Sequence, residues 1–204
     1  MRKCRYCKAE LPKAKDCNDP FKKGGFCNVN CMAAHGLAKS KASKEKAERK
    51  ELKARKEKLK TKADWTKEAQ KEFNRFIRLS DHGKDCISCD TPIIEIEGEQ
   101  GWKYGGAWDC GHYLTVGGHP ELRFTEDNAH KQCKSCNAGS SKYGNKGKSV
   151  ADRYREKLID RIGIKMVEWL EGPHEPAKYT IDDLKEIKAK YRRLANELKK
   201  ELDQ

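Results

Sequence analysis

Apolar residues recur with different spacing in successive parts of the chain, and these differences divide it into four segments. Residues 1–36 hold short apolar stretches among cysteines and glycines, which is typical of a small, loop-rich module. Residues 37–80 contain no glycine or proline and are interpreted as one long helix. The first half of this helix is almost wholly polar. The second half predicts a face that packs on the following segment, formed by Ala69, Phe73, Phe76, Ile77 and Leu79.

Residues 81–150 lack helical periodicity and predict a mixed order of elements. Residues 102–113 are rich in aromatic side chains and predict strands, and residues 122–124 predict a second strand. Residues 133–141 predict the opening of a helix. The segment therefore predicts a small unit of strands followed by a helix.

Residues 151–204 return to helical periodicity. Gly163 and the pair Gly172-Pro173 are expected to end two short helices, and Thr180-Ile-Asp-Asp183 is an N-capping pattern for a final helix. The apolar positions of this final helix are interpreted as packing residues: Leu184, Ile187, Tyr191, Leu194 and Leu198. The four segments together predict an α+β fold, in which α-helices flank a small mixed core.

The composition argues against a single large hydrophobic core, because only 36% of the residues are hydrophobic and 38% are charged. Small cores need stabilisation beyond apolar burial. Of the ten cysteines, most form close pairs: Cys4/Cys7, Cys27/Cys31, Cys86/Cys89 and Cys133/Cys136. The N-terminus has no apolar leader, and no apolar run approaches the roughly 20 residues that span a membrane. We therefore expect a reducing cytoplasm, where paired cysteines bind zinc rather than form disulfides.

Two structural zinc sites are predicted from the cysteine spacing. The first lies in an N-terminal module and has the ligands Cys4, Cys7, Cys27 and Cys31. Cys17 and His35 lie close in sequence and leave its fourth ligand open. The second has the ligands Cys86, Cys89, Cys133 and Cys136. Because four thiolates leave no open coordination position, this second zinc is expected to hold the fold rather than to take part in catalysis.

The net charge of +13 favours a polyanionic partner, most simply a nucleic acid. Residues 39–62 contain 12 basic and 4 acidic side chains. This basic helix can lie along phosphates through residues such as Lys53 and Arg55, or it can be a solvated helix held by Glu–Lys pairs. Leu52 and Leu59 lie one heptad apart, but the apolar stripe is too thin for a sustained coiled coil.

The motif that carries chemistry is Asp109-Cys-Gly-His112-Tyr, with Asn128 and Asn137 further along the chain. Hydrolysis of a phosphodiester needs a base that activates water, neutralisation of the phosphate charge and stabilisation of the leaving 3′ oxygen. A histidine with a pKa near neutrality serves as the base. One divalent cation with oxygen ligands can perform the other two tasks, and an asparagine amide suits such a cation. The motif therefore indicates a histidine base beside a hard cation.

His112, Asn128 and Asn137 resemble the three signature positions of the HNH endonucleases. The pattern Asn128-x4-Cys133-x2-Cys136-Asn137 is similar to the zinc-bearing branch of that family. The resemblance implies a ββα-metal fold in which the zinc braces the core. It also implies that His112 is the general base, that Asn128 braces the loop that orients this base, and that Asn137 binds Mg²⁺ or Mn²⁺.

One position departs from the HNH pattern. Many of these enzymes place an acidic residue or a histidine immediately before the base, as the first metal ligand, and here that position is Gly111. Asp109 is the nearest carboxylate, and a bulge or turn at Cys110 and Gly111 would aim it at the metal. We expect Asp109 to be this ligand and Cys110 to be a packing residue, because Mg²⁺ prefers oxygen.

A longer resemblance covers most of the chain and is strongest from Cys86 to Asn145. The order of a cysteine module, a basic helix, Cys-Ile-Ser-Cys, Trp-Asp-x-Gly-His-Tyr and Asn-x-His-Lys-Gln-Cys-x-x-Cys-Asn resembles the phage NinG family of recombination proteins, also called Rap. It implies a structure-specific endonuclease that cleaves branched DNA, including Holliday junctions and D-loops, in the host bacterial cytoplasm. Other recombination proteins are candidate partners. Junctions are nearly two-fold symmetric, so a homodimer is reasonable by symmetry.

Several other residues are candidates for contacts with nucleic acid. Arg123 and Lys142 can contact phosphates, and the loop around Lys146 can either cradle a phosphate through its backbone amides or be mobile. His130 can contact phosphate or the metal, or it can fill space. His119 is expected to be an exposed loop residue.

Two rival functions remain open. A non-enzymatic zinc protein that binds nucleic acid fits the cysteines and the charge equally well, but it has no need to keep His112 and Asn137 on one face. The other rival is an HNH nuclease of the restriction or homing type, and digestion of ordinary duplex DNA would favour it.

Overall fold

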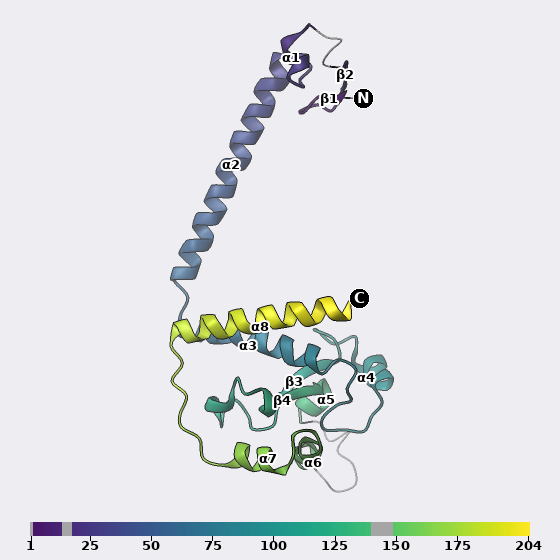
Figure 1. Cartoon of the computed structure of the whole chain (residues 1–204), viewed down its shortest axis with the longest axis vertical. Coiled ribbons are helices and arrows are strands. Elements are labelled where there is room, and N and C mark those ends of the chain that lie inside the picture. Colours follow the sequence, from purple (N-terminus) through teal and green to yellow (C-terminus); the bar gives the residue numbers. More distant parts are fainter. Residues whose placement is uncertain (1, 14–17, 140–148) are drawn as a thin grey trace. The chain divides into compact units, whose positions relative to one another are not determined.

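The structure is a computed structural model that describes residues 2–13, 18–139 and 149–204. It divides into two compact units, Met1–Lys60 and Thr61–Gln204, and each is described by itself (Figure 1). The described residues form a mixed α+β fold that is mostly helical and has two small sheets. No helix in these residues is long and apolar enough to cross a membrane.

The first unit combines a small hairpin with a long helix. Strand β1 (Arg2–Lys3) pairs antiparallel with β2 (Glu10–Leu11), and helix α1 (Pro20–Lys23) precedes α2 (Val29–Lys58). The core is correspondingly small and consists of Cys4, Leu11 and Phe26. None of the α2 residues is buried, so α2 gains no stability from a buried apolar face.

The single helix predicted over residues 37–80 is wrong, because the chain forms two helices there. Helix α2 ends at Lys58, and α3 (Lys62–Ser80) begins after a capping box. In this box the Thr61 hydroxyl accepts from the Asp64 amide at 3.2 Å, while the Asp64 carboxylate accepts from the Thr61 amide at 2.9 Å. This reciprocal cap satisfies backbone donors at a new helix start without glycine or proline.

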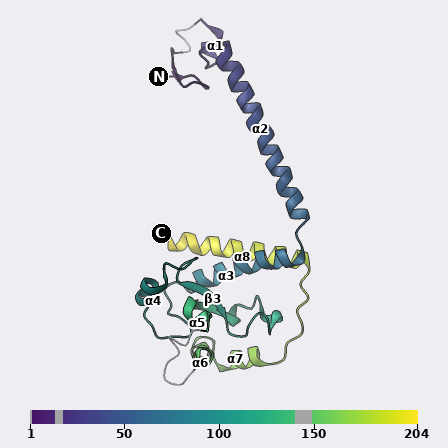
Figure 2. The ribbon, with the colours of Figure 1, turned by 180° about the vertical axis from the view of Figure 1, so that it is seen from behind.

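The second unit is built on α3 and α8 (Ile181–Leu202), which lie side by side in Figures 1 and 2. The predicted apolar face of α3 is confirmed at Ala69, Phe73 and Ile77, which are buried, whereas Phe76 and Leu79 are only half-buried. The Phe73 ring meets the Tyr191 ring edge-on with 4.9 Å between their centroids. Thr180 and Asp183 form the predicted capping box of α8.

A two-stranded antiparallel sheet lies against α3. It pairs β3 (Trp108–His112) with β4 (Ala129–Cys133), and its register is Trp108↔Cys133, Asp109↔Gln132, Cys110↔Lys131, Gly111↔His130 and His112↔Ala129. The strand predicted over residues 102–113 is therefore shorter than expected. Residues 122–124 are not a strand, because Pro120–Leu122 forms a 3-10 turn that buries Leu122. Proline favours the first turn of such a helix and cannot donate to a strand ladder.

Short helices complete the second unit. Helix α4 (Ile93–Gln100) was not predicted, and α5 (Lys134–Asn137) is a single turn that follows β4 directly. Helices α6 (Val150–Ile162) and α7 (Ile164–Glu171) end at Gly163 and Gly172, as predicted. Their apolar residues form a core with Ile87 and Leu122.

The alternation of side chains gives the hairpin two different faces. Cys110 and His112 share one face with Ala129, and this face packs on α3 and α8. Asp109 shares the opposite face with Gln132, on the side where α5 and α6 make their hydrogen bonds to β3.

Candidate functional site

The second predicted cysteine tetrad is assembled in the structure. The sulfur atoms of Cys86, Cys89, Cys133 and Cys136 all lie within 4.8 Å of one another, and all four residues are buried. Cys86 Sγ accepts hydrogen bonds from the amides of Ser88 at 3.4 Å and Cys133 at 3.3 Å. Amide donors of this kind stabilise thiolates. The tetrad can therefore hold a structural zinc that would join the loop after α3 to the start of α5.

The N-terminal tetrad is also assembled, in a more open setting. The sulfur atoms of Cys4, Cys7, Cys27 and Cys31 lie within 4.8 Å of one another, but only Cys4 is buried. His35 is not in this group, and its ring lies edge-on to Phe26 at 5.2 Å. Among the residues that the structure describes, Cys31 is thus the fourth candidate ligand. Cys17 lies outside them.

Two predicted metal ligands meet on one face of the hairpin. Asn137, at the end of α5, donates from Nδ2 to Asp109 Oδ2 at 3.2 Å. Lys134 Nζ lies 3.3 Å from Asp109 Oδ1. The two side chains offer a carboxylate and an amide oxygen at a partly exposed position. These are hard donors, and they suit Mg²⁺ or Mn²⁺ better than zinc.

The bulge or turn predicted at Cys110 and Gly111 is wrong, since β3 pairs one to one with β4 through both residues. A side chain at position 111 has no room, because its Cβ would overlap the side chain of Gln132. Gln132 is fixed in turn by a hydrogen bond of 2.7 Å from its Nε2 to Ser88 Oγ. The nearest carboxylate is that of Asp109, two residues earlier on the same face of β3, where it contacts Asn137 of α5.

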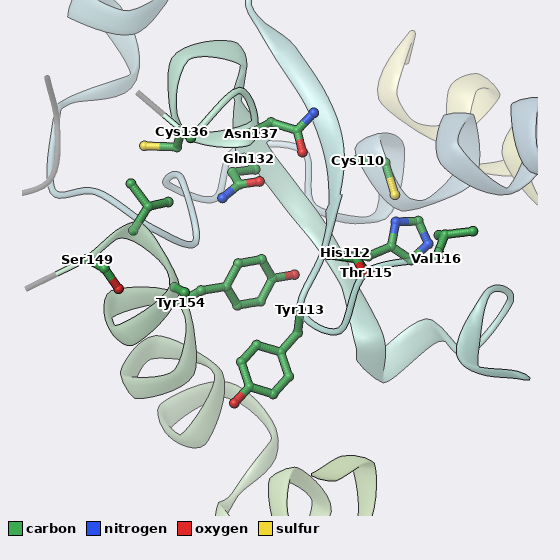
Figure 3. Close-up of a pocket in the computed structure, with 13 residues that line it drawn as sticks. Cys110, His112, Tyr113, Thr115, Val116, Gln132, Cys136, Asn137, Ser149 and Tyr154 are labelled. Atoms are coloured by element: carbon green, nitrogen blue, oxygen red, sulfur yellow. The ribbon is translucent and has the colours of Figure 1, made fainter. Parts of the chain in front are cut away.

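His112 lies on the other face of the hairpin. Figure 3 shows its ring on the side of Cys110, pointing away from Gln132 and Tyr154. The ring packs at 5.9 Å from the Phe73 ring, and Nε2 lies 3.1 Å from the Arg123 carbonyl oxygen. That carbonyl can only accept, so Nε2 carries the proton and Nδ1 keeps a lone pair.

The surroundings of His112 keep it neutral. Burial lowers the pKa of His112 below its ordinary value of 6.5, and the hydrogen bond to the Arg123 carbonyl opposes part of this shift. A neutral imidazole with a free Nδ1 is the form that a general base requires.

His112 and Asn137 were expected to share one face of the hairpin, and this prediction is wrong. Strand β3 separates the imidazole from the Asp109–Asn137 pair. Both residues nevertheless line the same cavity of about 850 Å³, which also contacts Tyr113, Gln132 and Tyr154 (Figure 3). The candidate base and the candidate cation ligands thus flank β3 beside one cavity.

Asn128 is fully buried and ties together the loop between the two strands. Its Oδ1 accepts from the Leu114 amide at 2.9 Å, and its Nδ2 donates to the carbonyls of Leu114 at 3.0 Å and Leu122 at 3.3 Å. The loop held in this way carries Arg123, whose carbonyl accepts from His112. Asn128 therefore acts on His112 through the backbone and does not contact the imidazole.

Sequence reasoning missed the buried carboxylate of Asp81, the C-cap of α3. It accepts from the Lys131 amide at 2.9 Å, lies 3.3 Å from His130 Nδ1, and accepts from Arg161 at 3.2 Å. Burial favours the neutral acid, but His130, Lys84 and the Lys131 amide hold the pKa of Asp81 well below its usual range. Of the roles left open for His130, the structure favours packing. The only sequence signal was an acid directly after an amphipathic helix.

The predicted nucleic-acid contacts have different surroundings. Arg123 is half-buried and donates to Gln70 Oε1 at 3.4 Å. Lys53 and Arg55 are exposed on α2, where Arg55 pairs with Glu51 at 2.7 Å. Lys142, Lys146 and the loop around Asn145 lie outside the described residues.

The fold and the site together define a mixed α+β protein with two cysteine tetrads that can bind zinc. A family model described as "Bacteriophage Lambda NinG protein" matches residues 1–201. The chain therefore belongs to the NinG family, as its resemblance indicated. No solved structure matches it.

Three relatives illustrate the extent of the match, and each is a protein named "Protein ninG". The chain is 38% identical to that of Salmonella phage P22 over 188 residues, which cover 85% of this chain and 84% of the relative. It is 38% identical to that of Escherichia phage lambda over 188 residues, which cover 85% of this chain and 83% of the relative. It is 37% identical to that of Escherichia phage 933W over 212 residues, with coverage of 97% and 94%.

Proposed function

We propose that this NinG protein is a metal-dependent DNA endonuclease with an HNH-like ββα-metal core formed by β3, β4 and α5. One observation carries the proposal: the pair Asp109–Asn137 is assembled at 3.2 Å on the strand whose last residue is an oriented, neutral His112. A protein that only binds nucleic acid needs neither feature. The order strand, strand, helix and the adjoining cysteine tetrad support the same assignment.

The residues can divide the work of hydrolysis between the two faces of the hairpin. His112 Nδ1 removes a proton from the attacking water. The Arg123 carbonyl accepts the hydrogen bond from Nε2 and so fixes the tautomer and the orientation of the ring. Asp109 and Asn137 would hold a Mg²⁺ or Mn²⁺ ion through their oxygens. Such an ion, when bound, neutralises charge on the phosphate and stabilises the leaving 3′ oxygen. Lys134 balances the Asp109 charge.

The proposed substrate is branched DNA, including Holliday junctions and D-loops. This part of the proposal rests on membership of the NinG family and the resemblance that it carries. The excess of positive charge supports a polyanionic partner but does not choose between branched and linear DNA. The proposed place of action is the cytoplasm of the host bacterium, with a homodimer on a nearly symmetric junction.

The test is cleavage of a synthetic four-way junction and of a linear duplex with the same arm sequences, each with Mg²⁺ and with Mn²⁺. Wild type is compared with His112→Ala, and His119→Ala is the matched control because it removes a partly exposed loop imidazole. All three proteins are first checked for equal zinc content. We expect wild type and the control to cut the junction in preference to the duplex, and His112→Ala to bind without cutting.

Other outcomes separate the rivals. Binding without cutting by wild type, with both cations, would support the non-enzymatic zinc protein. Equal cutting of junction and duplex would keep the nuclease and reject the preference for branched DNA.

A further inference from the structure

The two flanks of α3 carry opposite charges. Glu68 and Glu72 lie toward α8, where they pair with Lys188 at 2.6 Å and Arg192 at 2.8 Å. Lys67, Lys71 and Arg78 lie four and seven positions apart and form a stripe along a different flank of the helix. Across residues 2–13, 18–139 and 149–204, no carboxylate lies within ion-pair distance of these three cations.

A groove of about 400 Å³ follows this stripe. It is lined by four cations, two neutral amides and one hydroxyl: Lys67, Lys71, Arg78, Arg123, Gln70, Asn74 and Thr66. A second hollow of about 470 Å³ extends it past Thr66 toward Lys62. The groove offers several donors and no acid, which is the composition that binds a chain of anions.

The length of the stripe fits a run of phosphates. From Lys67 to Arg78 the helix rises about 16 Å, at 1.5 Å per residue. One strand of B-form DNA advances about 3.4 Å per phosphate along its axis, so the stripe spans roughly five phosphates. The flexible lysine side chains, which are exposed on α3, can adjust to this spacing.

Arg123 connects the groove to the candidate base. Its guanidinium lines the groove and donates to Gln70, while its carbonyl accepts from His112 Nε2. A strand held along α3 would therefore lead to the residue that orients His112.

We propose that the α3 groove binds the phosphodiester backbone of one nucleic-acid strand through Lys67, Lys71 and Arg78, and leads that strand to His112. This inference rests on the proposed function for the identity of the polyanion. Lys67, Lys71 and Arg78 line the groove but not the cavity beside His112, so binding through them can be measured without cleavage.

The experiment compares full-length wild type with Lys67→Gln/Lys71→Gln, using the four-way junction without added Mg²⁺ or Mn²⁺. The matched control is Lys199→Gln/Lys200→Gln, which removes the same charge from exposed positions near the end of α8. The logarithm of the binding constant is plotted against the logarithm of the salt concentration. We expect the slope to become shallower by about 2 in the groove variant, about 1 for each lost phosphate contact. The control is expected to keep the wild-type slope.

An unchanged slope in the groove variant would overturn the inference, as would an equal change in the control. If wild type cuts junctions and the groove variant binds them like wild type, the groove proposal is wrong and the nuclease proposal stands. If the groove variant shows a shallower slope but wild type does not cut, the groove proposal stands and the nuclease proposal is wrong. Circular dichroism of both variants checks that folding is unchanged.

Discussion

The two faces of the β3–β4 hairpin differ in burial and in chemistry. The His112 face, here called the closed face, packs on α3 and α8, and its half-buried imidazole is held neutral beside Phe73 while it lines the cavity. The Asp109 face meets a single helical turn, and its carboxylate and the Asn137 amide are partly exposed. The closed face suits a base whose tautomer and pKa must be fixed. The open face suits a cation that must exchange water for phosphate.

The largest expected effect comes from removing His112, the proposed base on the closed face. His112→Ala should lower kcat for junction cleavage by about 10²–10⁴-fold, because general-base catalysis contributes on that order. The affinity for uncut junction should change little. Single-turnover kinetics measure the first quantity, and a binding assay without divalent cations measures the second. Equal losses in both would contradict a catalytic role.

Removing the buried carboxylate behind the hairpin should weaken folding rather than chemistry. Asp81→Asn removes the charge of a buried carboxylate from its partly exposed partner Arg161, so the loss in the free energy of unfolding is at most that of a fully buried pair, about 3–5 kcal/mol. Urea titration measures this loss. Asp90→Asn is the control, because its carboxylate is largely exposed to solvent and pairs with Arg153 and Lys157. That pairing is worth at most about 1 kcal/mol.

The Asp81 effect should depend on pH in a defined direction. The folded-state pKa of Asp81 lies well below its unfolded value, so its stabilisation is present above the unfolded pKa of about 3.9. It is lost as the pH falls below that value. The stability difference between wild type and Asp81→Asn should therefore shrink in acid. A difference that stays constant down to strongly acid pH would mean that Asp81 stabilises the fold through shape alone.

Filling the tight contact at Gly111 should disturb the open face by a smaller amount. Gly111→Ala forces Gln132 away from Ser88, and overpacking of this kind costs about 1–3 kcal/mol. Gly117→Ala is the control, because a Cβ there meets no atom within 4 Å. Thermal unfolding measures both. A Gly111→Ala protein as stable as the control would show that Gln132 has room to move.

The smallest expected effect concerns the pH at which cleavage activity levels off. His112 must be neutral to act, and burial lowers its pKa below 6.5. The logarithm of kcat/KM should rise with unit slope in acid and level off at a pH below 6.5. An inflection above 6.5 would contradict the burial of the base.

The spacing of residues along the chain predicted the two tetrads and several helix ends, because these depend on local rules. Caps at Thr180, the stop at Gly163 and paired cysteines can each be recognised within a few residues. Alternation along a strand also places Asp109 and His112, three positions apart, on opposite faces. A bulge at Cys110 and Gly111 would have changed this alternation, but the strand pairs regularly and the two side chains lie on opposite faces.

Tertiary contacts decided what the sequence could not. The aromatic residues Trp102 and Tyr104 predicted a strand, but both are exposed in turns before β3 begins. Aromatic strand preference reflects packing against neighbours, and neither residue has such a surface. The role of Asp81 was likewise hidden, because its partners on β4 and α6 lie about 50 and 80 positions away in sequence.

The most direct test of the two-face account is a titration of zinc-loaded protein with Mn²⁺, followed by electron paramagnetic resonance of the free ion. Wild type and His112→Ala should each bind one Mn²⁺ with equal affinity, and Asp109→Asn/Asn137→Ala should lose this binding. That result would assign the cation to the open face and show that His112 on the closed face is not one of its ligands. Retention of Mn²⁺ by the double variant, or its loss in His112→Ala, would contradict the account.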